Sequence, residues 1–336
     1  MKHHRRENTN PSPDHQHKNE RCGAVRMPAS DIRIVFMGTP EFAVPSLEVL
    51  LAHNYEVAAV VTAPDRPQGR GMRVVPSPIK VVAKAHNIPV LQPTNLKSPA
   101  FLATLQSYQA TLQAVVAFRM LPRVVWAMPT LGTFNLHASL LPQYRGAAPI
   151  NWAIINGEQE TGVTTFFLEQ AMDTGPILFQ AREPIYPHDT AGTLHKRLQY
   201  QGAQLVLKTV QAIERRDYAE IPQVPTQESL HKKAPKIYKE DCQISWGQDS
   251  EIILNFIRGL SPYPAAWTVL NGRTYKILSA EKENTEFPRL NPGEIYSDGK
   301  RHVHVGTGNA NLAIKLLQLA GKKIMGVEEF LRGYKI

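Results

Sequence analysis

The stretch IRIVFMGTPEFAVPSLEVLLAHNYEVAAVVT, residues 32–62, decides the fold of this chain. Its first six residues are apolar except for Arg33, which is typical of a strand buried on both faces of a parallel sheet. Gly38, Thr39 and Pro40 end that run, and residues 44–52 favour a helix that carries Pro45 in its first turn, where a missing N–H costs little. Residues 56–62 form a second apolar strand, so the stretch predicts one strand–helix–strand unit.

The same alternation of strands and helices continues to residue 215. We expect strands over residues 89–91, 113–118, 132–137, 162–168 and 177–184, and helices over residues 79–86, 99–108, 148–156 and 190–215. Such alternation implies right-handed crossovers between parallel strands. The predicted fold class is therefore α/β, a Rossmann-like doubly wound sheet.

The pattern changes after residue 216. Residues 217–238 are rich in proline and contain the basic residues His231, Lys232 and Lys233, without a helical or strand period, which is typical of a linker. Next come short strand candidates over residues 242–246, 267–270, 274–280, 293–297, 302–306 and 311–319, with one helix over 250–260. Asn271-Gly272 and Asp298-Gly299 are hairpin-type turns. We predict an α/β domain over 31–216, a linker over 217–238 and a small C-terminal OB-like β-barrel over 239–334.

The N-terminal extension, residues 1–30, is rich in His, Asn, Pro and Gln and has almost no apolar residue to bury. We therefore expect it to be disordered. It also lacks the apolar stretch of a secretory signal. We expect Met27 to be the true initiator, and an N-terminal sequence of the native protein that begins before Met27 would contradict this.

Composition excludes several classes of protein. The apolar runs are far shorter than the roughly 20 residues that cross a bilayer, so we expect a soluble, cytoplasmic protein without a membrane partner. Cys22 and Cys242 are the only cysteines, which argues against a disulfide scaffold or a structural zinc, and no metal is expected. The net charge of +9 favours a polyanionic partner, although a merely basic enzyme fits as well. No G-x-G-x-x-G fingerprint or P-loop supports a nicotinamide enzyme or a nucleotidase.

Polar residues collect where the expected strand over residues 132–137 ends. Asn135 and His137 are two residues apart and share one face of that strand, and ligands collect at the carboxyl ends of such strands. Asp173 stands on a turn between two later strands and can reach back to an imidazole. Asn135 and a protonated His137 would stabilise an oxyanion, while Asp173 would hold the imidazolium and assist proton transfer. Taken singly, each residue also fits a purely structural role.

Basic residues are concentrated in two places. Arg66, Arg70 and Arg73 occupy a Gly- and Pro-rich loop, and guanidinium groups in such a loop suit contacts with RNA phosphates. A solvated loop is the alternative interpretation. Lys232 and Lys233 in the linker either continue this basic path toward the barrel or are simply solvated.

One family carries these motifs together. Residues 132–142 with Gly146, and Asp173-Thr174-Gly175, resemble the signature of the folate-dependent formyltransferases, in which an Asn-x-His-x-Ser-Leu-Leu-Pro segment and an Asp-x-Gly turn form the catalytic site. Residues 36–43, 64–71 and 144–150 add to the resemblance, which runs from about residue 32 to residue 331. It implies catalytic roles for Asn135, His137 and Asp173. It also implies a folate-binding set and a tRNA-binding set: Ser139, Leu140, Leu141, Pro142 and Phe118 for folate, and Arg66, Arg70, Arg73, Lys232 and Lys233 for tRNA.

The resemblance also implies the substrates. It points to 10-formyltetrahydrofolate as the formyl donor and to the amine of initiator methionyl-tRNA as the acceptor, in a monomeric enzyme of translation initiation. The chain departs from many relatives at Phe118 and Arg119, where those relatives carry Tyr and Gly. Two alternatives remain open: a formyltransferase for a sugar-nucleotide or ribonucleotide amine, and a tRNA-binding protein with a decayed catalytic site.

Overall fold

The computed structural model describes residues 32–68, 73–223, 231–283 and 287–336. The segment over residues 1–30 that we expect to be disordered, and Arg70, lie outside the described residues.

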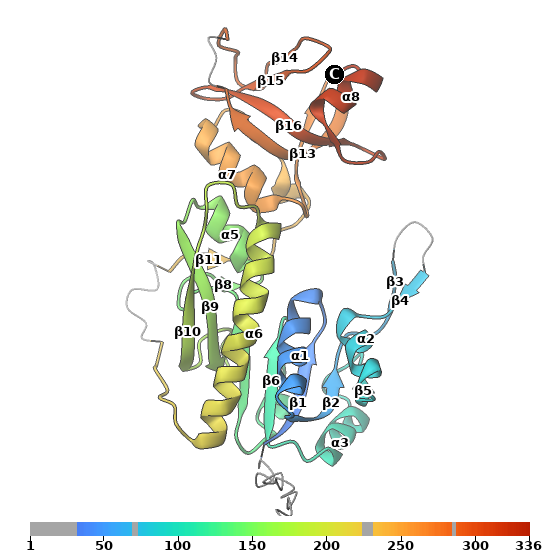
Figure 1. The fold of residues 1–336 in the computed structure, drawn as a ribbon, viewed down its shortest axis with the longest axis vertical. Coiled ribbons are helices and arrows are strands. Elements are labelled where there is room, and N and C mark those ends of the chain that lie inside the picture. Colours follow the sequence, from blue (N-terminus) through green and yellow to red (C-terminus); the bar gives the residue numbers. More distant parts are fainter. Residues whose placement is uncertain (1–31, 69–72, 224–230, 284–286) are drawn as a thin grey trace, which may run out of the picture. The chain divides into compact units, whose positions relative to one another are not determined.

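A seven-stranded sheet forms the centre of the N-terminal part, with the strand order β10-β9-β7-β6-β1-β2-β5 (Figure 1). Its parallel strands are β1 (Arg33–Gly38), β2 (Glu56–Val61), β5 (Val90–Leu91), β6 (Leu112–Val116) and β7 (Thr133–His137). Strand β9 (Glu160–Phe167) runs antiparallel to β7, and β10 (Ile177–Pro184) runs antiparallel to β9. The predicted mainly parallel sheet is confirmed.

Helices cover both faces of this sheet. They are α1 (Val44–Ala52), α2 (Pro78–Ala85), α3 (Pro99–Ser107), α4 (Arg123–Trp126), α5 (Pro149–Ile155) and α6 (Ala191–Arg215). After Arg33, β1 is apolar because alternate residues pack on opposite faces of the sheet. Ile34 and Phe36 belong to the core cluster that includes Leu198 of α6, whereas Val35 and Met37 belong to the opposite cluster, which includes α3.

None of the helices in the described part of the chain is long and apolar enough to span a membrane.

The loop expected over residues 63–78 contains a short hairpin, β3 (Arg66–Gln68) and β4 (Arg73–Val75). Lys80 at the start of α2 binds the carboxylate of Asp65 and the amide oxygen of Gln92, at 2.5 and 2.7 Å. Gln92 in turn donates to the other oxygen of Asp65 at 2.8 Å. These bonds fix the base of the hairpin to the sheet. No strand was predicted here because each of these strands has only three residues.

A second, antiparallel sheet forms the C-terminal part, in the order β12-β13-β16-β15-β14. Its strands are β12 (Ala266–Leu270), β13 (Arg273–Lys282), β14 (Ile295–Ser297), β15 (Val303–Gly306) and β16 (Asn311–Leu319), and β17 (Met325–Gly326) pairs with β16. Helices α7 (Ser250–Leu260) and α8 (Val327–Gly333) bury apolar side chains in the same core. Asn271 and Gly272 form the expected two-residue turn between β12 and β13, each with a positive φ. The predicted fold class is confirmed.

The strand expected over residues 242–246 was wrong. A short 3-10 helix, Glu240–Cys242, begins this segment, and only an isolated bridge from Gln243 to Trp267 follows. The alternating apolar residues that suggested a strand do point inward: Cys242, Ile244 and Trp246 are all buried. Alternation therefore reported burial correctly, but a strand also needs a partner along its whole length.

Candidate active site

The carboxyl end of β7 opens into a cavity of about 970 Å³. Asn135, His137 and Asp173 all line this cavity. The first two come from β7, and Asp173 comes from the turn between β9 and β10. Such a volume lies at the upper end of the roughly 300–1,000 Å³ range of small-molecule sites. The structure thus brings together the three side chains that the sequence singled out.

The imidazole of His137 has a defined orientation. Its Nε2 lies 2.9 Å from the backbone carbonyl oxygen of Tyr144. Because a carbonyl oxygen can only accept, Nε2 carries the hydrogen and donates it. Nδ1 is therefore the nitrogen that faces Asp173, whose Oδ2 lies 3.9 Å away. This separation is longer than a hydrogen bond, so the two side chains lie close together without a direct hydrogen bond.

Asp173 is held by the backbone around it. Its Oδ2 accepts a hydrogen bond of 3.0 Å from the N–H of Gly146, and its own carbonyl accepts one of 3.0 Å from the amide of Gln223. Gly146 has a φ of +126°, and a Cβ there would lie 2.4 Å from the carbonyl oxygen of Ala234. Only glycine fits this position, because β8 (Arg145–Gly146) pairs closely with β11 (Lys233–Ala234).

Asn135 lies in the middle of the sheet, between Val115 of β6 and Phe166 of β9. It is half-buried, and no protein group of the described residues bonds its side-chain amide. The amide hydrogens are therefore available to a ligand in the cavity.

Of the residues expected to bind folate, Phe118 lines the cavity as a half-buried ring. Arg119 lines it too, and its guanidinium donates to the carbonyls of Pro93 and Thr94, neither of which lines the cavity. The guanidinium carbon also lies 5.8 Å from the centre of the Phe118 ring. These contacts hold the positive charge at the edge of the cavity and leave the Phe118 ring beside it.

The four other residues expected to bind folate, Ser139, Leu140, Leu141 and Pro142, do not line the cavity. Ser139 is fully buried, and its hydroxyl donates to the carbonyl of Gln143 at 2.6 Å. Leu141 packs with Phe166. These bonds and contacts shape the loop behind the site, and a direct contact with folate stays a prediction.

The residues expected to bind tRNA are dispersed. Arg66 is exposed on β3, and Arg73 begins β4. Lys233 is exposed on β11. Lys232 is exposed as well, and its Nζ lies 2.5 Å from Oε1 of Glu158.

Further cavity walls come from segments that the sequence did not connect with the site, including Phe42, His195, Pro262 and Tyr263. Burial lowers the pKa of His195, against the opposing charge of Glu41, so this imidazole is neutral at physiological pH. Its ring packs edge-on against Phe42 at 5.0 Å. Among the described residues no cluster of three or more His, Cys, Asp or Glu could hold a metal ion.

Both parts of the chain match known protein families. Residues 32–210 match the family described as formyl transferase, and residues 236–335 match the formyl transferase C-terminal domain. A methionyl-tRNA formyltransferase of Azobacteroides pseudotrichonymphae genomovar. CFP2 is 52% identical over 315 residues, which cover 91% of this chain and 97% of that protein. One of Bacteroides fragilis is 48% identical, with coverages of 92% and 97%.

Solved structures share the fold. The sugar 3N-formyl transferase WlaRD, solved in the presence of dTDP and 5-N-formyl-THF, has a TM-score of 0.61 and 21% identity, covering 87% of this chain and 99% of that one. HypX from Aquifex aeolicus in complex with tetrahydrofolic acid has a TM-score of 0.63 and 21% identity, with coverages of 91% and 48%. With both family matches and relatives near 50% identity over most of its length, this chain belongs to the formyl transferase family.

Proposed function

We propose that this protein transfers the formyl group of 10-formyltetrahydrofolate to the amino group of initiator methionyl-tRNA, as a monomer in the cytoplasm. The convergence of Asn135, His137 and Asp173 on one cavity carries the proposal. It is supported by relatives of about 50% identity that are named methionyl-tRNA formyltransferases and that match this chain over both of its parts.

In this reaction the protein has to stabilise negative charge on the formyl oxygen and to transfer a proton. When the amine attacks the formyl carbon, negative charge builds on the formyl oxygen, and the amide of Asn135 donates to it. A protonated His137 donates from Nδ1, because its Nε2 hydrogen is already bound by the Tyr144 carbonyl. One such oxyanion donor contributes roughly 100- to 1,000-fold in rate.

Asp173 moves the proton. The attacking nitrogen loses a proton as it forms the new amide bond, and the departing N10 nitrogen of the folate gains one. The Asp173 carboxylate accepts the first proton and returns it as the second, and before this transfer its charge holds the His137 imidazolium 3.9 Å away. The N–H of Gly146 keeps the carboxylate in place throughout.

The two substrates use different surfaces in this proposal. The flat pterin ring packs on the apolar wall of the cavity that contains Phe118 and Leu168. Phosphates of the tRNA acceptor stem bind Arg66, Arg70 and Arg73 of the β3–β4 segment, where guanidinium groups make bidentate contacts.

The test is direct. The protein is incubated with 10-formyltetrahydrofolate and either charged methionyl-tRNA, glycinamide ribonucleotide or a dTDP-amino sugar, and formylated product is measured. We expect product from methionyl-tRNA alone, and a loss of at least about 100-fold in kcat for His137→Ala and Asp173→Ala with an unchanged melting temperature. Formylation of either small amine in preference to the tRNA would replace the proposed acceptor. Binding of tRNA without any transfer would make the chain an RNA-binding protein.

A further inference from the structure

Behind the imidazole of His137 lies a polar cluster made of Tyr144, Glu158 and Lys232. Tyr144 is buried at 5% exposure and has a left-handed backbone with a φ of 61°. For a residue other than glycine this conformation costs about 1–2 kcal/mol, so surrounding bonds must hold it. The contacts of Tyr144 identify those bonds.

The backbone of Tyr144 joins His137 to the linker. Its carbonyl accepts the Nε2 hydrogen of His137 at 2.9 Å, and its N–H donates to the carbonyl of Lys232 at 2.6 Å. The backbone N–H of Lys232 also donates to the side chain of Gln143 at 2.9 Å. The segment around Lys232 thus fixes the peptide that orients the imidazole.

The side chains of Tyr144 and Lys232 are also connected, through Glu158. The Tyr144 hydroxyl donates to Oε1 of Glu158, and Nζ of Lys232 donates to the same oxygen, each at 2.5 Å. Burial and Glu158 raise the pKa of the Tyr144 hydroxyl, which therefore stays a donor. Burial alone would raise the pKa of Glu158, but hydrogen bonds from Lys232 and Tyr144 outweigh it and lower that pKa. The carboxylate is consequently charged and shared by two donors.

We propose that Tyr144, Glu158 and Lys232 are positioning residues that fix the orientation of His137 and its Nε2 hydrogen bond, and that Lys232 serves this cluster instead of binding RNA. The inference rests on the proposed role of His137 in formyl transfer. The ammonium of Lys232 already has a carboxylate partner, and that negative charge weakens the attraction of the ammonium to a phosphate. Glu158, as an anion, would itself repel that phosphate.

The two interpretations of Lys232 predict different kinetic effects of the Glu158→Gln substitution. If Lys232 binds RNA, Glu158→Gln frees its ammonium and removes a repelling charge, so the KM for methionyl-tRNA falls. If the cluster positions His137, Glu158→Gln and Lys232→Met both lower kcat, because each loosens the Tyr144 peptide. The variants to measure are Lys232→Met, Glu158→Gln, the double variant and Lys232→Arg, each at saturating folate donor.

We expect Lys232→Met and Glu158→Gln each to lower kcat by about tenfold, in line with the loss of one charged hydrogen bond, with the KM for methionyl-tRNA within about twofold of wild type. The double variant should be no slower than the worse single variant, because both break one unit. Lys232→Arg should restore most of the rate. A raised KM with unchanged kcat in Lys232→Met, or a lowered KM in Glu158→Gln, would overturn the proposal.

The state of His137 can also be observed without any turnover. In the folded wild-type protein, ¹⁵N and ¹H chemical shifts of the His137 ring should report a hydrogen on Nε2 that is bonded to a carbonyl, and Lys232→Met should weaken that bond and shift both signals. Tyr144→Phe, which keeps the backbone but loses the hydroxyl, should do the same to a smaller extent. An unchanged His137 signal in both folded variants would refute the positioning role. A wild-type protein that transfers no formyl group would refute the proposed function, whatever these spectra show.

Discussion

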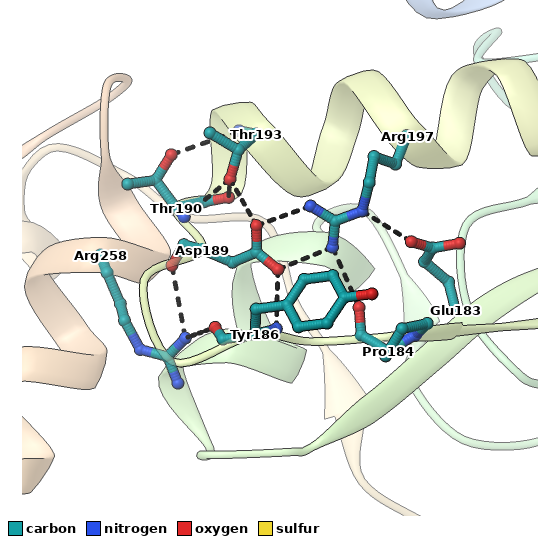
Figure 2. Close-up of polar contacts among 8 residues, drawn as sticks. All are labelled: Glu183, Pro184, Tyr186, Asp189, Thr190, Thr193, Arg197 and Arg258. Carbon is teal, nitrogen blue, oxygen red and sulfur yellow. Dashed lines mark hydrogen bonds and ion pairs between the residues drawn. The ribbon is translucent and has the colours of Figure 1, made fainter.

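Replacing Asp189 with Asn should destabilise the protein, because this carboxylate is the centre of a buried ionic cluster at the start of α6 (Figure 2). Its two oxygens accept a forked pair of hydrogen bonds from the guanidinium of Arg197, both at 2.6 Å. They also accept from the N–H of Tyr186 and the hydroxyl of Thr193, each at 2.8 Å. The Asp189 side chain is only 6% exposed, so water does not replace these bonds.

The cluster also links the two parts of the chain. Arg258 of α7 donates to the backbone carbonyls of Tyr186 and Asp189, as Figure 2 shows. Nearby, the N–H of Gly192 donates to the carbonyl of Ser261 at 3.0 Å. A shift of Asp189 would therefore disturb the contact through which Pro262 and Tyr263 reach the cavity.

The expected magnitude follows from burial. Removing one partner of a buried ion pair costs about 3–5 kcal/mol. The Arg197 side chain is 32% exposed and keeps a bond of 2.6 Å to Glu183, so part of its charge stays compensated. We expect Asp189→Asn to lower the free energy of unfolding by about 2–3 kcal/mol, with a melting temperature about 5 °C lower.

The matched control is Arg182→Gln, which breaks an ion pair with Glu160 whose side chains are 73% and 46% exposed. Exposed pairs contribute only about 0.2–1 kcal/mol. Urea unfolding of both variants and of the wild type provides the comparison. If Asp189→Asn is no less stable than Arg182→Gln, the cluster does not stabilise the fold as argued.

The difference between Asp189→Asn and the wild type should depend on pH. Burial alone would raise the pKa of Asp189, but the bonds from Arg197, Tyr186 and Thr193 outweigh it and lower that pKa below its ordinary value of 3.8. A carboxyl with a depressed folded-state pKa stabilises the protein fully above its unfolded-state pKa. That contribution disappears as the pH falls through the folded-state pKa. The two stabilities should therefore differ most at neutral pH and converge in acid.

Three other substitutions test the support of Asp173, a hairpin turn of the C-terminal sheet and the basic segment between β3 and β4. Gly146→Ala should lower kcat by about 100-fold with a smaller change in KM, since its Cβ would lie 2.4 Å from the Ala234 carbonyl and move the N–H that holds Asp173; a normal kcat would contradict this. Gly272→Ala should lower the free energy of unfolding by about 1 kcal/mol at an unchanged formylation rate, because its φ is +74°, and equal urea midpoints would argue against the strain. Arg70→Ala should lower activity toward methionyl-tRNA with the fold intact and reduce the salt dependence of tRNA binding by about one phosphate contact; an unchanged rate would reject that role.

Much of the fold could be predicted because local signals and burial agree. The apolar run of β1 predicted a strand buried on both faces, and alternate residues do lie in the two clusters on either side of the sheet. Helix α6 was expected over residues 190–215, and Thr190 is its N-cap, with its hydroxyl accepting from the N–H of Thr193. The strand predicted over residues 242–246 was wrong because alternating apolar residues indicate burial on one side and carry no information about a pairing partner.

The site could be predicted only in part, and the missing part has a common cause. Asn135 and His137 share one strand, so their spacing already places them together. The walls at Phe42, His195 and Pro262 come from three separate segments, and no periodicity relates such segments to one another.

Lys232 shows that the partner of a charged residue cannot be inferred from the sequence alone. In the linker it stands beside Lys233 and resembles one more surface cation, and composition alone cannot tell the two apart. In the structure both side chains are exposed, but Lys232 pairs with Glu158, 74 residues earlier in the chain. That partner lies just after α5, so only the fold brings it to the linker. A basic residue therefore argues for RNA binding only once its carboxylate neighbours are known, and by that criterion Lys233 is the better candidate of the pair.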